Sequence, residues 1–374
     1  MASRAVQVNS DLADILEKVE SGQRLSLDDA ARIFRSDDVL SLGWMANLVR
    51  ERRHGDMAYY NINAHIEPTN VCVLAQVCKF CAFGKRRDEE GAYTLSADEI
   101  LAKAEKLHSP GVSEFHIVGG LHPDLKLEFF EDLLARLESK FPDVHLKCLT
   151  ALEIEHIARI SHVSVRECLE RLKEAGLDSL PGGGAETFSE RARNIICRGK
   201  LSPEKWMDVH RTAHELGLRS NATMLYGHVE TPEERAEHLV ALRELQDETG
   251  GFLAFVPLAY HPENNPLGEQ VRFFTTGLDD LRVIAASRLI LDNFDHIKAY
   301  WVMVGPKLAQ VALRFGADDI HGTVVEERIG HDAGARTPGG LTETQLIRLI
   351  RQAARIPVRH DSLYQKLEVM PQET

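Results

Sequence analysis

Two kinds of hydrophobic periodicity divide the chain. In residues 10–55 apolar positions recur every three or four residues, for example at Leu12, Ile15, Leu16 and Val19, which is the spacing of an amphipathic helix. Ser26 stands just before the next apolar run and is a typical N-cap. We therefore expect a helical N-terminal extension over residues 1–57.

From about residue 59 short apolar runs alternate with helical segments. The expected strands cover residues 59–67, 114–119, 145–151, 178–181, 219–226, 252–259, 297–304 and 317–321, and the expected helices cover 96–108, 127–140, 164–175, 202–216, 232–248, 278–292, 307–315 and 342–354. Gly176, Gly217 and Gly316 follow three of these helices as C′ residues. Alternating strands and helices indicate a parallel sheet, and eight units are the number of a closed (β/α)8 barrel of the TIM type. We place an α/β barrel at residues 58–356 and a C-terminal tail at 357–374, with a partly open barrel as the alternative because the closing strand is weak.

Polar residues alternate with apolar ones along the first expected strand. Residues two apart in a strand face the same side, so one face carries Asn61, Asn63, His65, Glu67 and Thr69. The apolar face would pack on the helices, which leaves the polar face to line the barrel interior. That burial is costly unless the polar groups are hydrogen-bonded or bind a polar ligand. We expect a ligand-lined cavity, with a self-satisfied polar network as the alternative.

Composition and charge narrow the class of partner. The chain has 374 residues, of which 44% are hydrophobic, and a formal net charge of −13. This is typical of a globular protein with a sizeable core, and it argues against a protein that binds the phosphate backbone of nucleic acid. The N-terminus has no apolar signal region and no apolar run approaches about 18 residues, so we expect a cytoplasmic protein that does not bind a membrane.

Three of the six cysteines, Cys72, Cys78 and Cys81, lie within ten residues of one another. Without a secretion signal these should be reduced thiols, which favours a metal site over disulfides. Zinc would need a fourth ligand, for which His65 or His108 could serve, because no second Cys/His pair follows Cys81 at 12–20 residues. Three cysteines alone suit a [4Fe–4S] cluster with one iron open to a small molecule. The other cysteines, Cys148, Cys168 and Cys197, are scattered, and we expect them to be buried as small apolar side chains.

Longer runs add a family resemblance. The segments are HIEPTNVC at 65–72, EFHIVGGLHP at 114–123, GLDSLPGGGAE at 176–186, HRTAHELG at 210–217, SNATMLYGH at 220–228 and LQDETGGF at 245–252. Over about residues 30–360 the chain resembles the aminofutalosine synthases (aminodeoxyfutalosine synthases), radical S-adenosylmethionine (SAM) enzymes of the futalosine route to menaquinone. It departs from the usual Cys-x3-Cys-x2-Cys spacing, because here the spacing is Cys-x5-Cys-x2-Cys. A surface loop can absorb two extra residues at small entropic cost. The different spacing therefore leaves only the path of residues 73–77 in question.

The resemblance implies a cofactor and a reaction. A [4Fe–4S] cluster on Cys72, Cys78 and Cys81 would bind SAM as a co-substrate and would need a reducing electron donor of the flavodoxin or ferredoxin type. The 5′-deoxyadenosyl radical would add to the enol-ether double bond of a small-molecule substrate, 3-[(1-carboxyvinyl)oxy]benzoate. Rearrangement and loss of the carboxylate as bicarbonate or CO2 would then give aminofutalosine (6-amino-6-deoxyfutalosine).

The same resemblance and the positions of the strand ends indicate the site residues. Expected to bind the cofactors are Phe80, Val118, Gly119, Gly120, Gly183, Gly184 and Glu186. His65 and Glu67 are the candidates for catalysis. Candidates for substrate contact are Asn221, Thr223, Tyr226, His228, Arg193, Arg198 and His321, the last three because a substrate carboxylate needs an Arg, Lys or His partner.

Three alternatives stay open. The cyclic dehypoxanthinylfutalosine synthases and the deazaflavin-cofactor synthases share the cluster and the Pro-Gly-Gly-Gly-Ala-Glu type of loop. A different class is a non-catalytic zinc-binding interaction protein, which would be colourless. Residues 326–340 are Gly-rich and polar, and they could form a lid or a plain loop.

Overall fold

The computed structural model describes residues 10–109, 111–365 and 367–370, so parts of the expected N-terminal extension and C-terminal tail lie outside it. Most of its strands alternate with helices. The strands are β1 (Met57–Asn61), β2 (Asn63–Ile66), β3 (Glu114–Ile117), β4 (His145–Cys148), β5 (Ser179–Leu180), β6 (Arg219–Tyr226), β7 (Phe252–Ala259), β8 (His296–Ile297), β9 (Asp319–Gly322), β10 (Ile356–His360) and β11 (Leu367–Val369).

The strands form a closed ring. The strands from β2 to β8 make one sheet in chain order, and every pairing in it is parallel. On one side of β9, Ala299 donates its N–H to the Asp319 carbonyl at 2.7 Å. On the other side Thr323 donates to the Asn61 carbonyl at 3.3 Å. These bonds join β8 to β9 and β9 to β1, which confirms the predicted (β/α)8 architecture.

The first expected strand, 59–67, is two strands that meet at Ile62. β1 pairs with β9 on one side and with β10 on the other, whereas β2 pairs with β3. In the second pairing His65 lies opposite His116. β10 and β11 belong to the segment that the sequence analysis set apart as a tail, and β10 extends the barrel wall beside β1. The division into three parts stays a prediction.

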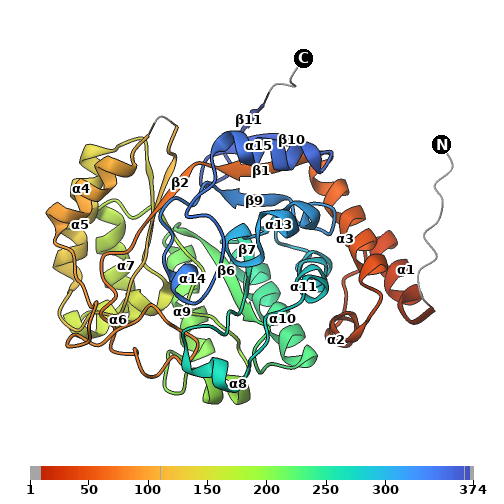
Figure 1. The fold of residues 1–374 in the computed structure, drawn as a ribbon, viewed down its shortest axis with the longest axis horizontal. Helices are drawn as coiled ribbons and strands as arrows, with labels where there is room; N and C mark the ends of the chain where they lie inside the picture. The colour runs from red at the N-terminus through yellow and green to blue at the C-terminus, as the bar shows by residue number, and fades with distance from the viewer. Residues whose placement is uncertain (1–9, 110, 366, 371–374) are drawn as a thin grey trace.

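Helices surround the ring of strands (Figure 1). They are η1 (Ser10–Leu12), α1 (Ala13–Ser21), α2 (Leu27–Arg35), α3 (Val39–His54), α4 (Ala97–Leu107), α5 (Leu127–Lys140), α6 (Ala151–Ser161), α7 (Val165–Glu174), α8 (Glu190–Ile196), α9 (Pro203–Glu215), α10 (Pro232–Thr249), η2 (Pro266–Glu269), α11 (Gly277–Ile290), α12 (Trp301–Val304), α13 (Pro306–Ala312), α14 (Ile329–Asp332) and α15 (Glu343–Gln352). All eight predicted helices are present. Their starts follow local capping: Ser96 accepts the N–H of Glu99, whose carboxylate in turn accepts the N–H of Ser96.

One predicted strand was wrong, and some helices were missed. The segment 297–304 is not one strand, because β8 ends at Ile297 and Trp301–Val304 is the helix α12. A short apolar run has the same pattern in a buried strand and in a buried helical turn, and here the Trp301 indole donates to the Gly322 carbonyl at 2.8 Å. The helix α6 was missed although its capping box, Thr150 and Glu153, is visible in the sequence.

The N-terminal helices pack on one flank of the barrel. α2 lies against α10 and α11, and α3 lies against α11 (Figure 1). Ile15, Ile33 and Met45 are buried in the same apolar cluster as barrel residues such as Phe255. The helical prediction for residues 10–55 is therefore confirmed, and the extension shares its core with the barrel.

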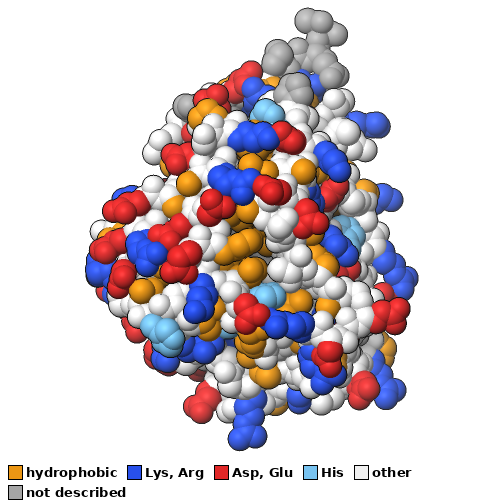
Figure 2. Space-filling model, turned by 90° about the vertical axis from the view of Figure 1, so that its left-hand side faces the viewer, with side chains coloured by type: hydrophobic (Ala, Val, Ile, Leu, Met, Phe, Trp, Pro, Cys, Tyr) orange, Lys and Arg blue, Asp and Glu red, His pale blue; other side chains and the backbone are white. Residues whose placement is uncertain are grey.

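The surface carries charges of both signs. On the face toward the viewer in Figure 2, Lys and Arg side chains are interspersed with Asp and Glu side chains. Among the described residues there is no helix long and apolar enough to cross a membrane.

Candidate active site

A cavity of about 310 Å³ opens at the C-terminal ends of the strands. In (β/α)8 enzymes this is the end at which the loops build the active site. Of the residues expected from the sequence, those that line it are Cys72, Cys78, Cys81, Phe80, Val118, Gly119, Gly120, Gly183, Gly184, Glu186, His65, Asn221, Thr223 and His321. Strand ends far apart in sequence therefore meet the cysteine loop in one place.

The five-residue gap in the cysteine motif forms compact turns. Ala75 donates its N–H to the Cys72 carbonyl at 3.1 Å, and Cys78 donates to the Leu74 carbonyl at 3.1 Å. These bonds turn the chain back, so that Cys72 and Cys78 line the same cavity. The longer spacing is thus absorbed within the loop.

Two thiol sulfurs accept backbone hydrogen bonds. The N–H of Leu74 points at Cys72 Sγ and the N–H of Gly84 points at Cys81 Sγ, each at 3.4 Å. Burial raises the pKa of the Cys78 thiol to about 12, so in the apoprotein this sulfur is protonated at neutral pH. Backbone donors of this kind stabilise the negative sulfur that a metal ligand needs.

The spacing of the thiols suits a cluster better than a single ion. A tetrahedral zinc site with Zn–S bonds of about 2.3 Å needs sulfurs about 3.8 Å apart. Within the described part of the chain, only His54, His296 and Asp318 bring three ligand atoms within 4.8 Å of one another, and the cysteines of this loop do not. His108, one proposed fourth zinc ligand, does not line the cavity. Three thiols on one cavity, two of them with backbone donors, fit a [4Fe–4S] cluster that leaves one iron free.

Glycines let the strand ends approach the cysteine loop. A Cβ on Gly120 would lie 2.4 Å from the carbonyl oxygen of Val71, and one on Gly119 would lie 2.8 Å from that of Thr69. Gly119 also donates its N–H to a Glu153 carboxylate oxygen at 2.9 Å. Burial raises the pKa of Glu153 to about 7. Glu153 lines the cavity and was not singled out from the sequence.

A second missed residue is Lys200. Its ammonium lies 2.5 Å from a Glu186 carboxylate oxygen and 5.3 Å from the centre of the Phe80 ring. Burial opposes the charge of Lys200, but Glu186 together with the neighbouring Cys78 and Cys197 favours it, and the net effect is that the pKa of Lys200 is raised. Nothing in the sequence around Lys200 marks it, because the pairing depends on a loop 14 residues away.

Histidines form part of the cavity wall. His65 stacks on His116 with ring centres 4.5 Å apart and an interplanar angle of 10°. His321, on β9, packs against Tyr300 at 4.5 Å. Burial lowers the pKa of His65 to about 3 and holds that of His321 well below its usual value, so both imidazoles are neutral. Deeper in the barrel, Glu114 and Lys147 form a buried ion pair at 2.5 Å.

The side chains of Glu67 and Tyr226 lie outside the cavity. One Glu67 oxygen lies 3.3 Å from the ammonium of Lys103, and burial raises the pKa of Glu67 to about 7. Tyr226 donates its hydroxyl to Asp280 at 2.8 Å, on the face of β6 opposite to Asn221 and Thr223. Neither residue lines the cavity.

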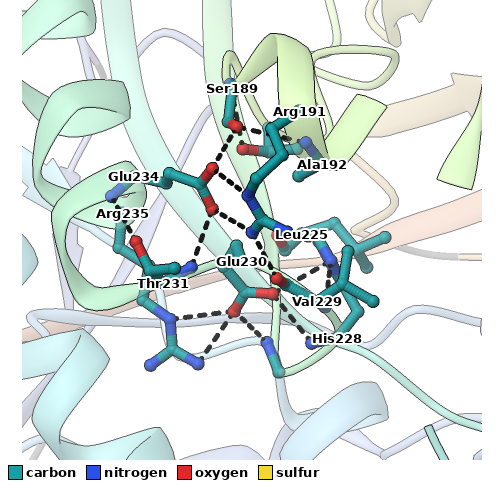
Figure 3. Close-up of polar contacts among 12 residues, drawn as sticks. Ser189, Arg191, Ala192, Leu225, His228, Val229, Glu230, Thr231, Glu234 and Arg235 are labelled. Atoms are coloured by element: carbon teal, nitrogen blue, oxygen red, sulfur yellow. Dashed lines mark hydrogen bonds and ion pairs between the residues drawn. The ribbon is translucent and has the colours of Figure 1, made fainter. Parts of the chain in front are cut away.

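His228, Arg193 and Arg198 also lie outside the cavity. His228 donates from Nε2 to the Leu225 carbonyl at 3.0 Å and belongs to the polar network around Glu230 in Figure 3. Arg193 is buried and donates to the carbonyl oxygens of Ala185 and Thr187, while Arg198 is exposed. His228 and Arg193 therefore stabilise loops around the site.

The segment 326–340 closes over the mouth of the barrel. Its helix α14 lies in front of the ring of strands in Figure 1, and Ile329 and Gly330 line the cavity. Glu327 also lines the cavity and lies 3.0 Å from Nδ1 of His331. This hydrogen bond raises the pKa of His331 to about 9, so a partly exposed ion pair within the segment is present at neutral pH.

Comparison with known proteins identifies the family. A family model described as the radical SAM superfamily matches residues 66–242, and one described as the CofH/MqnC C-terminal region matches residues 249–373. The aminodeoxyfutalosine synthase of Thermus thermophilus is 49% identical over 360 residues, which are 96% of each chain. The chain belongs to the radical SAM superfamily. Membership implies a [4Fe–4S] cluster and SAM, and the three loop cysteines are the residues that would hold the cluster.

This radical SAM enzyme has further relatives. The aminodeoxyfutalosine synthase of Streptomyces coelicolor is 42% identical over 364 residues, 95% of this chain and 93% of the relative. The 5-amino-6-(D-ribitylamino)uracil–L-tyrosine 4-hydroxyphenyl transferase of Methanococcoides burtonii is 41% identical over 328 residues, 86% of this chain and 90% of the relative.

Solved structures share the fold. The [FeFe]-hydrogenase maturase HydG of Carboxydothermus hydrogenoformans superposes with a TM-score of 0.73 at 18% identity, covering 95% of this chain and 81% of that one. Methylornithine synthase (PylB) has a TM-score of 0.72 at 18% identity, covering 92% and 97%. At this identity the likeness concerns the barrel alone.

Proposed function

We propose that this radical SAM enzyme is an aminodeoxyfutalosine synthase. It would add the 5′-deoxyadenosyl group of SAM to the enol-ether double bond of 3-[(1-carboxyvinyl)oxy]benzoate. Rearrangement and loss of the carboxylate as bicarbonate or CO2 would give aminofutalosine, with release of methionine. SAM is consumed, because its adenosine ends in the product.

One observation carries the proposal. The likeness to the Thermus thermophilus synthase is 49% identity over 96% of both chains, so the matched region extends over nearly the whole barrel and is not limited to the cysteine loop. A cavity of about 310 Å³ is within the usual size range of small-molecule sites. Its lining is largely apolar, with the polar groups at the strand ends, which suits an aromatic acid beside a nucleoside.

The residues of the cavity divide into proposed roles. When bound, the cluster supplies the electron that cleaves the S–C5′ bond of SAM. Cys72, Cys78 and Cys81 would hold it, and the backbone at Gly119 and Gly120, which lines the cavity, would lie beside SAM. The adenosine part would contact Phe80, Val118, Gly183, Gly184 and Glu186. The substrate would contact the other cavity residues predicted from the sequence, which are His65, Asn221, Thr223 and His321. The proposed site does not include five residues that lie outside the cavity: Glu67, Tyr226, His228, Arg193 and Arg198.

The barrel contributes by positioning and by excluding water. Glu153, which forms a capping box with Thr150, fixes the turn after β3 by accepting the N–H of Gly119. The 326–340 segment covers the mouth, which protects a radical from solvent. An electron donor of the flavodoxin or ferredoxin type completes the proposal.

The test is an anaerobic incubation of the reconstituted enzyme with SAM, dithionite and 3-[(1-carboxyvinyl)oxy]benzoate. We expect an adenosine–benzoate adduct with the mass of aminofutalosine. Free 5′-deoxyadenosine without an adduct would overturn addition chemistry and indicate a hydrogen-abstracting relative.

A second candidate rests on the likeness to the Methanococcoides burtonii transferase at 41% identity. The same assay with L-tyrosine and 5-amino-6-(D-ribitylamino)uracil, the compounds in that relative's name, decides between the two. A product from this pair, and none from the enol ether, would favour the transferase.

A further inference from the structure

The cavity has no permanent cation free to receive an anionic substrate. Of the described residues that line it, Lys200 is the only Lys or Arg, and Glu186 neutralises it at 2.5 Å. Glu327 is likewise paired with His331 at 3.0 Å. The proposed substrate carries two carboxylates, so other donors must receive them.

Two histidines of the wall have a ring nitrogen without a partner. Nε2 of His65 and Nδ1 of His321 are buried and have no hydrogen-bond partner among the described residues. The two residues are only 5% and 9% exposed, and they come from neighbouring parts of the ring, β2 and β9. Beyond the effect of burial, His65 is close enough to His321 to contribute to the lowering of its pKa, and both residues line the cavity. A buried polar atom without a partner is costly, so a ligand in the cavity that supplies the partner would favour a turn of each ring that brings this nitrogen to the cavity.

The chemistry of the free nitrogens suits an acceptor such as a carboxylate. A neutral imidazole carries one N–H, and both His65 and His321 can place it on the unpartnered nitrogen. His261 is a useful contrast in the same wall. It donates from Nε2 to the Met303 carbonyl at 3.0 Å, so its unpartnered Nδ1 is an acceptor in the neutral ring.

We propose that His65 and His321 form the subsite for one carboxylate of the substrate, each donating a hydrogen bond from its unpartnered ring nitrogen. The inference rests on the proposed function, because the aryl enol-ether dicarboxylate is the substrate considered. His116 is a positioning residue in this arrangement, since its ring stacks on His65 and orients it.

Binding without turnover tests the subsite. The reconstituted enzyme with its cluster oxidised is saturated with SAM and titrated calorimetrically with 3-[(1-carboxyvinyl)oxy]benzoate. Two further probes each lack one carboxylate: (1-carboxyvinyl)oxybenzene and 3-(vinyloxy)benzoate. The variants are His65→Phe and His321→Phe, which remove the donor and keep a ring.

We expect each variant to raise the Kd of the dicarboxylate by about 10- to 100-fold, the loss typical of a hydrogen bond to a charged group. The probe that lacks the carboxylate held by the histidines should bind wild type and variants within about twofold, which also identifies that carboxylate. The Kd of SAM should not change. If His65→Phe does not fold, His321→Phe decides alone, because both donors serve one carboxylate.

His210→Phe is the matched control. His210 also has a buried ring nitrogen without a partner, but it packs between Trp206 and Phe252, outside the cavity. It should leave the affinities for all three probes unchanged.

Two results overturn the subsite: unchanged affinity for the dicarboxylate in both variants, or an equal loss for all three probes, which would indicate general damage. The proposed function fails separately. If wild type binds the dicarboxylate but forms no adduct after reduction, the function is wrong while the variants still decide the subsite. If wild type does not bind the dicarboxylate, both are wrong.

Discussion

The ammonium of Lys200 lies 2.5 Å from a carboxylate oxygen of Glu186, and the side chains of the pair are only 5% and 10% exposed. Lys200 also lies over the ring of Phe80, so one buried ion pair connects the Gly-rich loop after β5 to the cysteine loop. Removing one member of a buried pair leaves an uncompensated charge, which is typically more costly than removing both.

Lys200→Met should therefore lower the free energy of unfolding by about 3 kcal/mol. The double variant Lys200→Met/Glu186→Gln should recover more than half of this loss. Urea denaturation of the apoprotein measures both. Arg166→Met is the control, because its pair with Glu215 is about half exposed and should contribute less than about 1 kcal/mol. Equal losses in the single and double variants would contradict the coupling.

Cys78→Ala and Cys81→Ala should each give a protein that stays colourless after anaerobic reconstitution with iron and sulfide, since three thiolates are needed to hold the cluster. Product formation should fall to background. Iron and sulfide analysis and the visible absorption spectrum measure the loss. Cys168→Ala is the control, because Cys168 is buried in α7 and does not line the cavity. Zinc without iron in the reconstituted wild type would favour the zinc-binding alternative.

Gly120→Ala should disturb the cysteine loop. The added Cβ would lie 2.4 Å from the Val71 carbonyl oxygen, a backbone atom, so the loop must move. A displacement of about 1 Å near the reacting groups can cost about 100-fold in rate. We expect product formation to fall at least about tenfold, measured at saturating SAM. Gly339→Ala, whose Cβ meets nothing within 4 Å, should retain the wild-type rate, and a wild-type rate in Gly120→Ala would refute the argument.

Glu153 should make stability depend on pH. Burial raises its pKa to about 7 from 4.5, so between these values the folded protein binds a proton that the unfolded chain has released. Stability from this group is thus present below about pH 4.5 and lost as pH rises through about 7, by about 3 kcal/mol in total. Glu153→Gln should remove this decline. Urea denaturation at pH 5, 6 and 8 measures the difference between the two proteins, in which the other titrating groups cancel. Parallel curves for wild type and variant would show that Glu153 does not titrate in this range.

The His331–Glu327 pair should control access to the cavity. The hydrogen bond to Glu327 raises the pKa of His331 to about 9, so the ion pair is complete below about pH 6.5 and is lost as pH rises through about 9. Limited proteolysis within 326–340 should be slow at pH 7 and about fivefold faster at pH 10, the factor expected for loss of a partly exposed pair. His331→Gln should be cleaved quickly at both values. Cleavage of the exposed segment 86–90 is the internal control. An unchanged cleavage pattern in His331→Gln would show that the ion pair does not hold the 326–340 segment in place.

Local signals in the sequence determined the helices, the parallel barrel and the cysteine loop. Helical periodicity and caps such as Ser96 act within a few residues of the chain. Eight alternating strand–helix units are compatible with only a few arrangements of the strands in a sheet. The split of the first strand at Ile62 and the pairing of β10 with β1 were not visible, because both depend on a strand formed some 300 residues later in the chain.

Only the tertiary structure decided which side chains meet in the cavity. Strand alternation alone already separates Asn221 and Thr223 from Tyr226 in β6, and the structure places the first two toward the cavity and Tyr226 against Asp280. The Lys200–Glu186 pair, the bond from Gly119 to Glu153 and the two unpartnered histidine nitrogens carry no local signal, since a side chain's partner is set by packing between distant segments. The sequence determined which residue types were available at the strand ends, and the closure of the ring decided which of them face one another.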